Sequence, residues 1–437
     1  MLACAAAVLL PAGSSADVNS PNMRIDWSFP EGPVRTHSDI AAWGNILVAG
    51  NYDGFRVFDL DQPLANRLLV NYLCRGPQND VSLWDNNGQL LLFQSIDTPQ
   101  TNGETTCSQN RQSDTTACGT ACFEGIRIFD LSTPSAPVYL KGVYTDCGSH
   151  THTLVPDLAN NRLLIYVSSY PSSTGPRCQY PHAKISIVEV PLDAPQNASV
   201  IATPPIDAPV GVFGIGCHDI TVFLAIHKAS AACQSEGQLW DISDPANPDT
   251  LHPLRMNDPS VSFWHSSEFT WDGQYVIFDD EALGNYFCGS SEPVGRIHIF
   301  RVSDGQQMSS FNISRQQGVY CSVHNGNLIP VAGRYLLVAA WYGGGTSVID
   351  LTDPTSPHEI GYYVATSGRR ADTWSSYWYN GKIYANDINR GVDVFNIVTP
   401  RRPFGATFGH LNAQTQEDLL PSIASSMPLA RLVAPAR

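Results

Sequence analysis

Residues 347–364, SVIDLTDPTSPHEIGYYV, contain the pattern that decides the fold. Two apolar runs, 347–351 and 359–364, flank a turn that carries Pro354 and Pro357. Proline has no amide hydrogen and stops a strand, so the stretch predicts two short β-strands joined by a tight turn.

The run at 347–351 belongs to a repeat that reads apolar, apolar, acidic or polar, apolar. Its seven copies are residues 56–60, 127–131, 186–190, 238–242, 298–302, 347–351 and 393–397. Upstream of most copies, two further strand-like runs enclose a turn such as Asp272-Gly273 or Asn380-Gly381, and both pairs are strong hairpin signals. Each unit is therefore predicted to be a four-stranded meander. Seven such units predict an all-β chain, a seven-bladed β-propeller of four-stranded antiparallel blades.

The predicted propeller covers residues 17–412, and two segments compete to close it. Residues 23–29 precede the first unit and can pair with residues 392–397 of the last one. The rival is 404–411. Residues 413–437 show no strand pattern and end in a Pro/Ala/Ser-rich stretch, which predicts a C-terminal tail.

Residues 1–16 predict a signal peptide. They are apolar and alanine-rich and end in Ser14-Ser15-Ala16, which suits signal peptidase. A basic n-region is missing, which indicates a truncated leader, and Leu2-Ala3-Cys4 as the remains of a lipoprotein signal is the alternative. Beyond residue 16 no apolar run approaches the ~20 residues of a membrane helix. We therefore expect a secreted or cell-surface protein, with the lipoprotein form as a variant of that expectation.

Eleven cysteines agree with export, because ten follow the leader without a CxxC pair, as is typical of disulfides in an oxidising compartment. Blade geometry predicts the pairs Cys147–Cys178, Cys217–Cys233 and Cys288–Cys321. Cys74 is expected to join one of three cysteines, with the other two joined together: Cys107, Cys118 and Cys122.

Charge excludes one class of partner. The chain has 25 Lys and Arg against 40 Asp and Glu, a net charge of -15, and no basic run. Nucleic acid would be repelled, so a nucleic-acid-binding function is excluded.

Histidines recur where the first strand of each unit begins, and this is the rim at which the second strand ends. The predicted metal ligands are His37, His152, His218, His265 and His324. His150 stands in the same position, and Glu281 follows a second strand. Imidazole with carboxylate suits a divalent first-row metal such as Cu, Mn or Zn. The alternative for each histidine is a structural brace hydrogen-bonded to a turn residue.

The repeat resembles that of the bacterial LVIVD-repeat proteins, a family of secreted propellers that is largely uncharacterised. The shared pattern is Gly-apolar-Arg-apolar-apolar-Asp-apolar followed by Ser/Thr-x-Pro, over residues 37–400. Copies three, five and seven depart from it at the acidic position. The resemblance implies the fold and no particular activity.

Two functions remain open. The first is a binding module whose rim takes a small molecule, a glycan or a protein. The alternative is a metal-dependent oxidase or lyase, with His218, His265 and His324 as ligands and Glu268 or Glu281 as general base. Residues 217–220 resemble methanethiol oxidases of the selenium-binding family, and the architecture is similar to that of oligogalacturonate lyases; both place metal-binding histidines on seven-bladed propellers. A purely structural surface protein is a third possibility.

Overall fold

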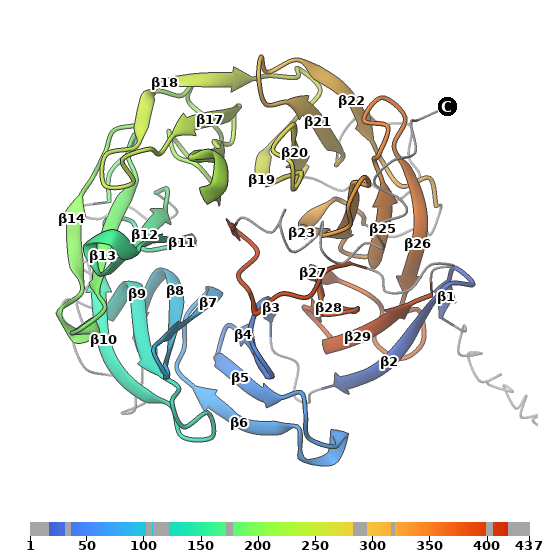
Figure 1. Cartoon of the computed structure of the whole chain (residues 1–437), viewed down its shortest axis with the longest axis horizontal. Helices are drawn as coiled ribbons and strands as arrows, with labels where there is room; N and C mark the ends of the chain where they lie inside the picture. The colour runs from blue at the N-terminus through green and yellow to red at the C-terminus, as the bar shows by residue number, and fades with distance from the viewer. Residues whose placement is uncertain are drawn as a thin grey trace, which may run out of the picture.

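The computed structural model describes residues 17–30, 36–101, 107, 122–171, 178–282, 295–315, 320–398 and 405–417. Seven small antiparallel sheets stand around a common axis (Figure 1). The chain is therefore a seven-bladed β-propeller, as the repeat predicted. Each blade is numbered by the repeat copy that it contains.

Every blade contains four main strands in chain order from the axis outward, except that the outermost strand of blade 7 comes from the N-terminal part of the chain. Blade 6 also carries β1 (Val18–Asn19), which pairs with the outer edge of β26. Blades 1 and 2 consist of β3 (His37–Trp43), β4 (Ile46–Asn51), β5 (Gly54–Asp59), β6 (Leu68–Leu73), and of β7 (Gln78–Asn86), β8 (Gln89–Thr101), β9 (Cys122–Asp130), β10 (Val138–Tyr144). Blades 3 and 4 consist of β11 (Thr151–Asp157), β12 (Arg162–Ser168), β13 (Ser186–Pro191), β14 (Ser199–Ala202), and of β15 (Asp219–Phe223), β16 (Lys228–Ala232), β17 (Gly237–Asp241), β18 (Asp249–Met256).

The second half of the ring repeats this order. Blades 5 and 6 consist of β19 (Trp264–Phe269), β20 (Tyr275–Asp280), β21 (Ile297–Arg301), β22 (Gln307–Phe311), and of β23 (His324–Ile329), β24 (Leu336–Ala340), β25 (Thr346–Asp350), β26 (His358–Val364). Blade 7 consists of β27 (Thr373–Tyr379), β28 (Lys382–Asp387), β29 (Gly391–Ile397) and β2 (Met23–Pro30). Short 3-10 turns lie at η1 (Leu64–Asn66), η3 (Leu158–Asn160), η4 (Pro195–Asn197) and η5 (Leu224–Ile226).

All seven repeat copies lie on the third strands, and the aspartate of the repeat has a defined role there. In blade 6, Asp350 Oδ1 accepts a hydrogen bond from the N–H of Thr352 at 2.9 Å, and Asp59 of blade 1 accepts one from Asp61 at 3.0 Å. A carboxylate bonded to the backbone two residues ahead starts a turn, so this aspartate ends the strand. Every third strand also shifts register against its outer neighbour, which shows that the copies are structurally equivalent.

The N-terminal strand closes the ring. β2 pairs antiparallel with β29, from Met23 opposite Ile397 to Pro30 opposite Gly391. Of the two candidates, residues 23–29 are thus confirmed. Within blade 7, the predicted hairpin turn has positive φ at both Asn380 and Gly381, as the tight turn between β27 and β28 requires.

The end of the described chain enters the centre of the ring instead of leaving it. β30 (His410–Leu411) pairs with β3 of blade 1, and β31 (Thr415–Gln416) pairs in parallel with β15 of blade 4. Figure 1 shows this segment crossing the axis. The prediction that residues 413–437 contain no strand is therefore wrong for residues 415–416. We call residues 408–417 the axial segment.

The core is divided into seven apolar clusters, one between each pair of neighbouring blades. Between blades 7 and 1, for example, Tyr377 and Tyr379 pack with Ile40, Leu47 and Phe58, and none of the five is more than 1% exposed. Because each blade is buried on both faces by its neighbours, the ring fixes where every innermost strand begins.

Three disulfides lie within the described residues. Cys147–Cys178 and Cys217–Cys233 are confirmed, and Cys74 pairs with Cys107 of its three candidates. Cys321 is also disulfide-bonded. The expected partners Cys288 and Cys118, and the side chain of Cys122, lie outside the described residues. Residues 1–16, the predicted leader, are not among the described residues either.

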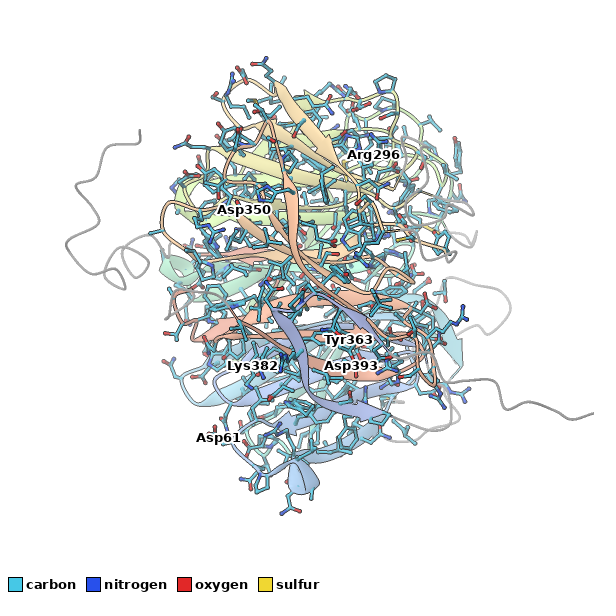
Figure 2. The ribbon with its side chains drawn as sticks, turned by 90° about the vertical axis from the view of Figure 1, so that its right-hand side faces the viewer. Asp61, Arg296, Asp350, Tyr363, Lys382 and Asp393 are labelled. Carbon is cyan, nitrogen blue, oxygen red and sulfur yellow. A yellow bond between two sulfur atoms is a disulfide. The ribbon has the colours of Figure 1, made fainter. Side chains whose placement is uncertain are left out.

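The ring has two faces that carry different connections. In a side view, Asp350 and Asp61, at or after the ends of third strands, lie on one face, and Arg296, which precedes β21, lies on the other (Figure 2). We call this second face the mouth, because the innermost strands also begin there. Within the part of the chain that the structure describes, there is no helix with the length and apolar character needed to cross a membrane.

Candidate metal centre

Four histidines from four consecutive blades form a row at the mouth of the propeller. This histidine row consists of His150, His218, His265 and His324. Neighbouring ring centroids in the row lie 4.2, 4.0 and 4.1 Å apart. None of the four residues is more than 6% exposed. Each stands at or just before the start of an innermost strand, so ring closure gathers side chains that are far apart in the sequence.

β-Bulges direct the imidazoles of blades 5 and 6 toward the mouth. The pairing of β19 with β20 shifts register around His265, and the pairing of β23 with β24 shifts directly after His324. A bulge bends its strand and re-aims the side chain at that point. A Cβ atom on Gly326 would collide with the carbonyl of Val338, so this bulge needs glycine. β11 and β15 pair without a shift, and their histidines immediately precede them.

Backbone carbonyls fix the tautomers of two rings in the row. Nδ1 of His218 donates to the carbonyl of His265 at 3.1 Å, and Nδ1 of His324 donates to the carbonyl of Trp374 at 2.6 Å. With the proton on Nδ1, Nε2 of each neutral ring keeps its lone pair. Burial, and after it the neighbouring imidazoles, lower the pKa of His218 and of His324, so both rings are neutral at pH 7.

Two carboxylates hold His265. Its Nδ1 lies 3.3 Å from Oδ2 of Asp279, and its Nε2 lies 3.9 Å from Oε2 of Glu281. Burial lowers the pKa of His265, but the two carboxylates outweigh burial and raise it to about 9. Nε2 has no hydrogen-bond partner among the described residues. A carboxylate on the far nitrogen is the usual device that orients a metal-binding imidazole.

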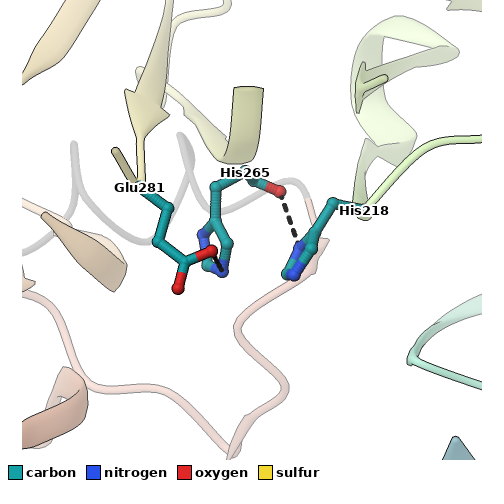
Figure 3. Close-up of side chains that lie close together, drawn as sticks. All are labelled: His218, His265 and Glu281. Carbon is teal, nitrogen blue, oxygen red and sulfur yellow. Dashed lines mark hydrogen bonds and ion pairs between the residues drawn. The ribbon is translucent and has the colours of Figure 1, made fainter. Parts of the chain in front are cut away.

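His218, His265 and Glu281 form a group that can hold a metal ion (Figure 3). One donor atom from each residue lies within 4.8 Å of the donor atoms of the other two. Two imidazoles and one carboxylate suit a divalent first-row ion, and three protein donors leave a coordination position for another ligand. The sequence named all three residues as site candidates, Glu281 as a general base. The identity of the ion stays a prediction.

His150, which the sequence placed at the rim but did not name as a metal ligand, lies directly beside this group. Its Nε2 is 2.7 Å from Nε2 of His218. Two lone pairs cannot face each other at that distance, so one ring carries a proton between them. The hydroxyl of Tyr170 lies 3.0 Å from both ring nitrogens of His150, and Oδ1 of Asp97 lies 3.4 Å from Nδ1. His150 is therefore a third imidazole beside the two of the metal group.

Aromatic side chains enclose the group. The hydroxyl of Tyr342 donates to Oε1 of Glu281 at 2.7 Å, and the ring of Trp374 lies 4.8 Å from that of His324. The other rings that line this region are Tyr52, Tyr170, Phe213 and Phe263. With a side chain 18% exposed, Glu281 is the most accessible of the three donors.

Two of the predicted ligands lie elsewhere and act as braces. In His152, Nε2 is 2.6 Å from the hydroxyl of Ser82 and Nδ1 is 2.8 Å from that of Ser95, so the ring joins blades 2 and 3. Nδ1 of His37 accepts a hydrogen bond from Nη2 of Arg56 at 3.1 Å. Neither histidine belongs to the metal group. The brace alternative describes their contacts.

Glu268, the other predicted general base, is separated from the mouth. It lies three residues beyond His265 on β19 and lines a small cavity deeper in the ring.

Sequence reasoning also missed Asp279, although three acidic residues follow one another at 279–281. Because side chains alternate along a strand, the side chains of the first and third of these residues, Asp279 and Glu281, point to the same side. Accordingly, Asp280 instead accepts hydrogen bonds from backbone N–H groups of neighbouring loops.

Comparisons with known proteins assign no family. No protein-family model matches the chain, and no curated protein matches its sequence. Among solved structures, the computationally designed protein Ika8 is similar, with a TM-score of 0.46 and 11% sequence identity over 84% of this chain and 98% of the other.

Proposed function

We propose that this protein is an exported metal-binding propeller that holds one divalent first-row ion at its mouth and binds a small molecule through it. His218, His265 and Glu281 supply the protein ligands. The observation that carries the proposal is the orientation of the rings. In His218, His265 and His324, Nδ1 faces an acceptor in the protein, which directs Nε2 away from that acceptor. An ion at Nε2 of His218 would displace the proton that lies between this atom and Nε2 of His150.

The surroundings favour a small molecule over a glycan or a protein as the ligand. The donor atoms lie among aromatic rings, and His218 and His265 are 6% and 0% exposed. A macromolecular surface could not reach donors buried to this degree. A small ligand could take the coordination position that three protein donors leave, with its body against Tyr342 or Phe213.

Metal stoichiometry tests the proposal. The purified full-length protein would be stripped with a chelator, dialysed against Zn²⁺, Cu²⁺ or Mn²⁺ in separate experiments, and analysed by mass spectrometry of the elements. We expect one tightly bound equivalent of one of these ions. His218→Ala and His265→Ala should each weaken its binding about tenfold or more.

Two histidine variants serve as controls. His252 is exposed on β18, and His152 is a buried brace outside the metal group, so His252→Ala and His152→Ala should keep the ion. Wild-type protein that binds no equivalent, or His218→Ala and His265→Ala variants that bind as well as wild type, would contradict the proposal.

One contact favours the second candidate, a metal-dependent oxidase or lyase. The Tyr342 hydroxyl bonded to Glu281 places a proton donor beside the metal group. Small thiols with dioxygen, and acidic oligosaccharides, are the substrates to assay with the metal-loaded protein. Turnover that Tyr342→Phe reduces at unchanged metal content would support an enzyme. If the metal-loaded protein is inactive on both substrate classes, the binding module is the function that remains.

The assignment to the LVIVD-repeat family and the secreted location belong to the same proposal. The repeat residues that carry the resemblance all fall on third strands, and three disulfides within the described residues fit an oxidising compartment. Fractionation of the native host, with the mature N-terminus sequenced, would test export and distinguish a cleaved leader from a lipid-modified Cys4.

A further inference from the structure

A small cavity lies on the axis beside the histidine row. It has a volume of about 10 Å³, which is room for one water-sized occupant and for no organic molecule. Asp219, Ser266 and Asn325 line it, and they directly follow His218, His265 and His324 in the sequence. Neighbouring residues of a strand point in different directions. The same three blades therefore present nitrogen donors at the mouth and oxygen atoms to this cavity.

Two carboxyl groups line the cavity. They belong to Asp219 and Glu268, which are 1% and 8% exposed. No lysine or arginine lines the cavity within the described residues. Two carboxyl groups thus share this small space, and the nearby imidazole of His265 acts on Asp219.

Two neutral oxygen atoms in residues that line the cavity also have no hydrogen-bond partner within the described part of the chain. They are Oδ1 of Asn325 and Oγ of Ser266, in residues that are 6% and 4% exposed. A buried polar atom without a partner is costly, and most such atoms in native proteins are satisfied. An occupant that accepts lone pairs from both atoms would remove this cost.

We propose that this cavity binds a single hard metal cation, Ca²⁺ in particular, through the carboxylates of Asp219 and Glu268, Oδ1 of Asn325 and Oγ of Ser266. Donor sets made only of oxygen select hard cations, and Ca²⁺ accepts carboxylates, amide carbonyls and water in flexible geometry. The cation neutralises the two acids and gives both unpaired oxygens a partner. The site is independent of the metal at the mouth, whose ring donors are nitrogen atoms.

A second cavity lies beside this site, along the axial segment. Glu268 and Ala413 also line this second cavity of about 80 Å³, enclosed between the axial segment and blades 5 and 6. This second cavity extends to Glu417, whose side chain is 36% exposed.

Terbium luminescence tests the proposal, because Tb³⁺ replaces Ca²⁺ at oxygen sites and is sensitised by nearby aromatic rings, here Tyr377 at the cavity wall. With chelator-stripped full-length protein, we expect emission to saturate at one equivalent of Tb³⁺ and to fall when Ca²⁺ is added. Asp219→Asn and Glu268→Gln should each weaken binding at least about tenfold. Ca²⁺ should raise the melting temperature of the wild type and not that of either variant.

Testing a variant of each site with the metal of the other site distinguishes the two sites. Glu281→Gln should keep the Tb³⁺ signal while losing the transition metal at the mouth, and Glu268→Gln should do the reverse. If a charge variant fails to fold, Asn325→Ala carries the same test. The proposal is overturned if the wild type shows neither saturable Tb³⁺ emission nor stabilisation by Ca²⁺, since protons then hold the two carboxyls neutral. It is equally overturned if Asp219→Asn and Glu268→Gln leave the signal unchanged.

Discussion

His152 shows how one buried imidazole can hold two blades together. Its ring nitrogens bond Ser82 and Ser95, and Nδ1 also lies 3.1 Å from Oδ2 of Asp80. Burial raises the pKa of Asp80, but the charge and hydrogen bonds of His152 outweigh burial and lower it. The histidine therefore keeps a buried carboxylate ionised between the blades.

Removing this ring should destabilise the fold without affecting the mouth. His152→Ala removes the imidazole beside buried Asp80, which keeps the backbone N–H of residue 152 as a donor. Because a buried pair is broken, we expect a loss of about 3 kcal/mol in the free energy of unfolding. Urea denaturation followed by tryptophan fluorescence measures the loss. His252→Ala, at an exposed position, should change stability by less than about 0.5 kcal/mol. Equal midpoints for the two variants would refute the brace.

His182 predicts how stability depends on pH. Burial, and then Lys184, lower its pKa from 6.5 to about 4 against the opposing effect of Asp146, and Ser169 lies 3.0 Å from Nε2. As pH falls below 6.5 the unfolded chain binds a proton that the folded chain does not. This contribution to stability is thus lost between pH 6.5 and about 4, up to about 3 kcal/mol. The His182→Gln variant should lose about 3 kcal/mol less than the wild type between pH 6.5 and about 4, measured by chemical denaturation at several pH values. Parallel plots of unfolding free energy against pH for the two proteins would contradict this prediction.

The histidines also show where sequence reasoning stops at this scale. His150 and His152 are two residues apart, a spacing that permits both side chains to face the same side of a regular strand. In the structure, His150 precedes β11 and turns to the mouth, whereas His152 is paired within the strand opposite Val167. The rim and the residue types could be predicted. Which ring reaches the axis depends on strand ends and bulges that no residue pattern reveals.

At the scale of the element, the axial segment pairs with inner strand edges that would otherwise be bare. The amide of Asn412 accepts from the N–H of Leu83 and donates to its carbonyl, both at 2.8 Å. Gln416 makes the same pair of bonds with Phe269, at 2.8 and 2.9 Å. An innermost strand has an unpaired edge toward the axis, so these amides complete the backbone hydrogen bonding of blades 2 and 5.

Loss of either amide should therefore weaken the ring. Asn412→Ala and Gln416→Ala each remove two hydrogen bonds to buried backbone, and we expect each to lower the free energy of unfolding by about 2 kcal/mol. The two sites contact different blades, so the double variant should be additive. Chemical denaturation measures all three. Asn247→Ala, whose amide bonds Asp244 at an exposed turn, is the matched control and should be nearly neutral. Unchanged denaturation midpoints would mean that the axial segment lies at the centre of the ring without stabilising it.

The axial segment could not be predicted because its signal is too short. β30 and β31 are two residues each, and two residues carry no alternation. Their pairing depends on free edges that exist only after the blades have assembled. The longer N-terminal strand was predictable, since Ile25, Trp27 and Phe29 alternate with polar residues over one full strand.

For the whole molecule, closure depends on a partner that comes from the other end of the chain. Met23 of β2 pairs opposite Ile397 and is fully buried with Ile329, Leu336 and Val338 of blade 6. Met23, from the N-terminal strand, thus completes the apolar cluster between the last two blades. The repeat predicted seven units, but a ring is stable only if the last sheet is complete, because each blade is buried by both neighbours.

Met23→Ala should therefore destabilise the entire ring, while Ile25→Ala on the same strand should not. Met23 is 0% exposed and Ile25 is 39% exposed. Cavity formation at the first should lower the free energy of unfolding by about 3 kcal/mol, and truncation at the second by less than about 1 kcal/mol. Circular dichroism and tryptophan fluorescence should give one coincident transition for Met23→Ala, because opening the ring exposes clusters on both sides of blade 7. An early separate transition, with the remaining blades melting as in the wild type, would show that blade 7 can detach and that closure does not stabilise the other six.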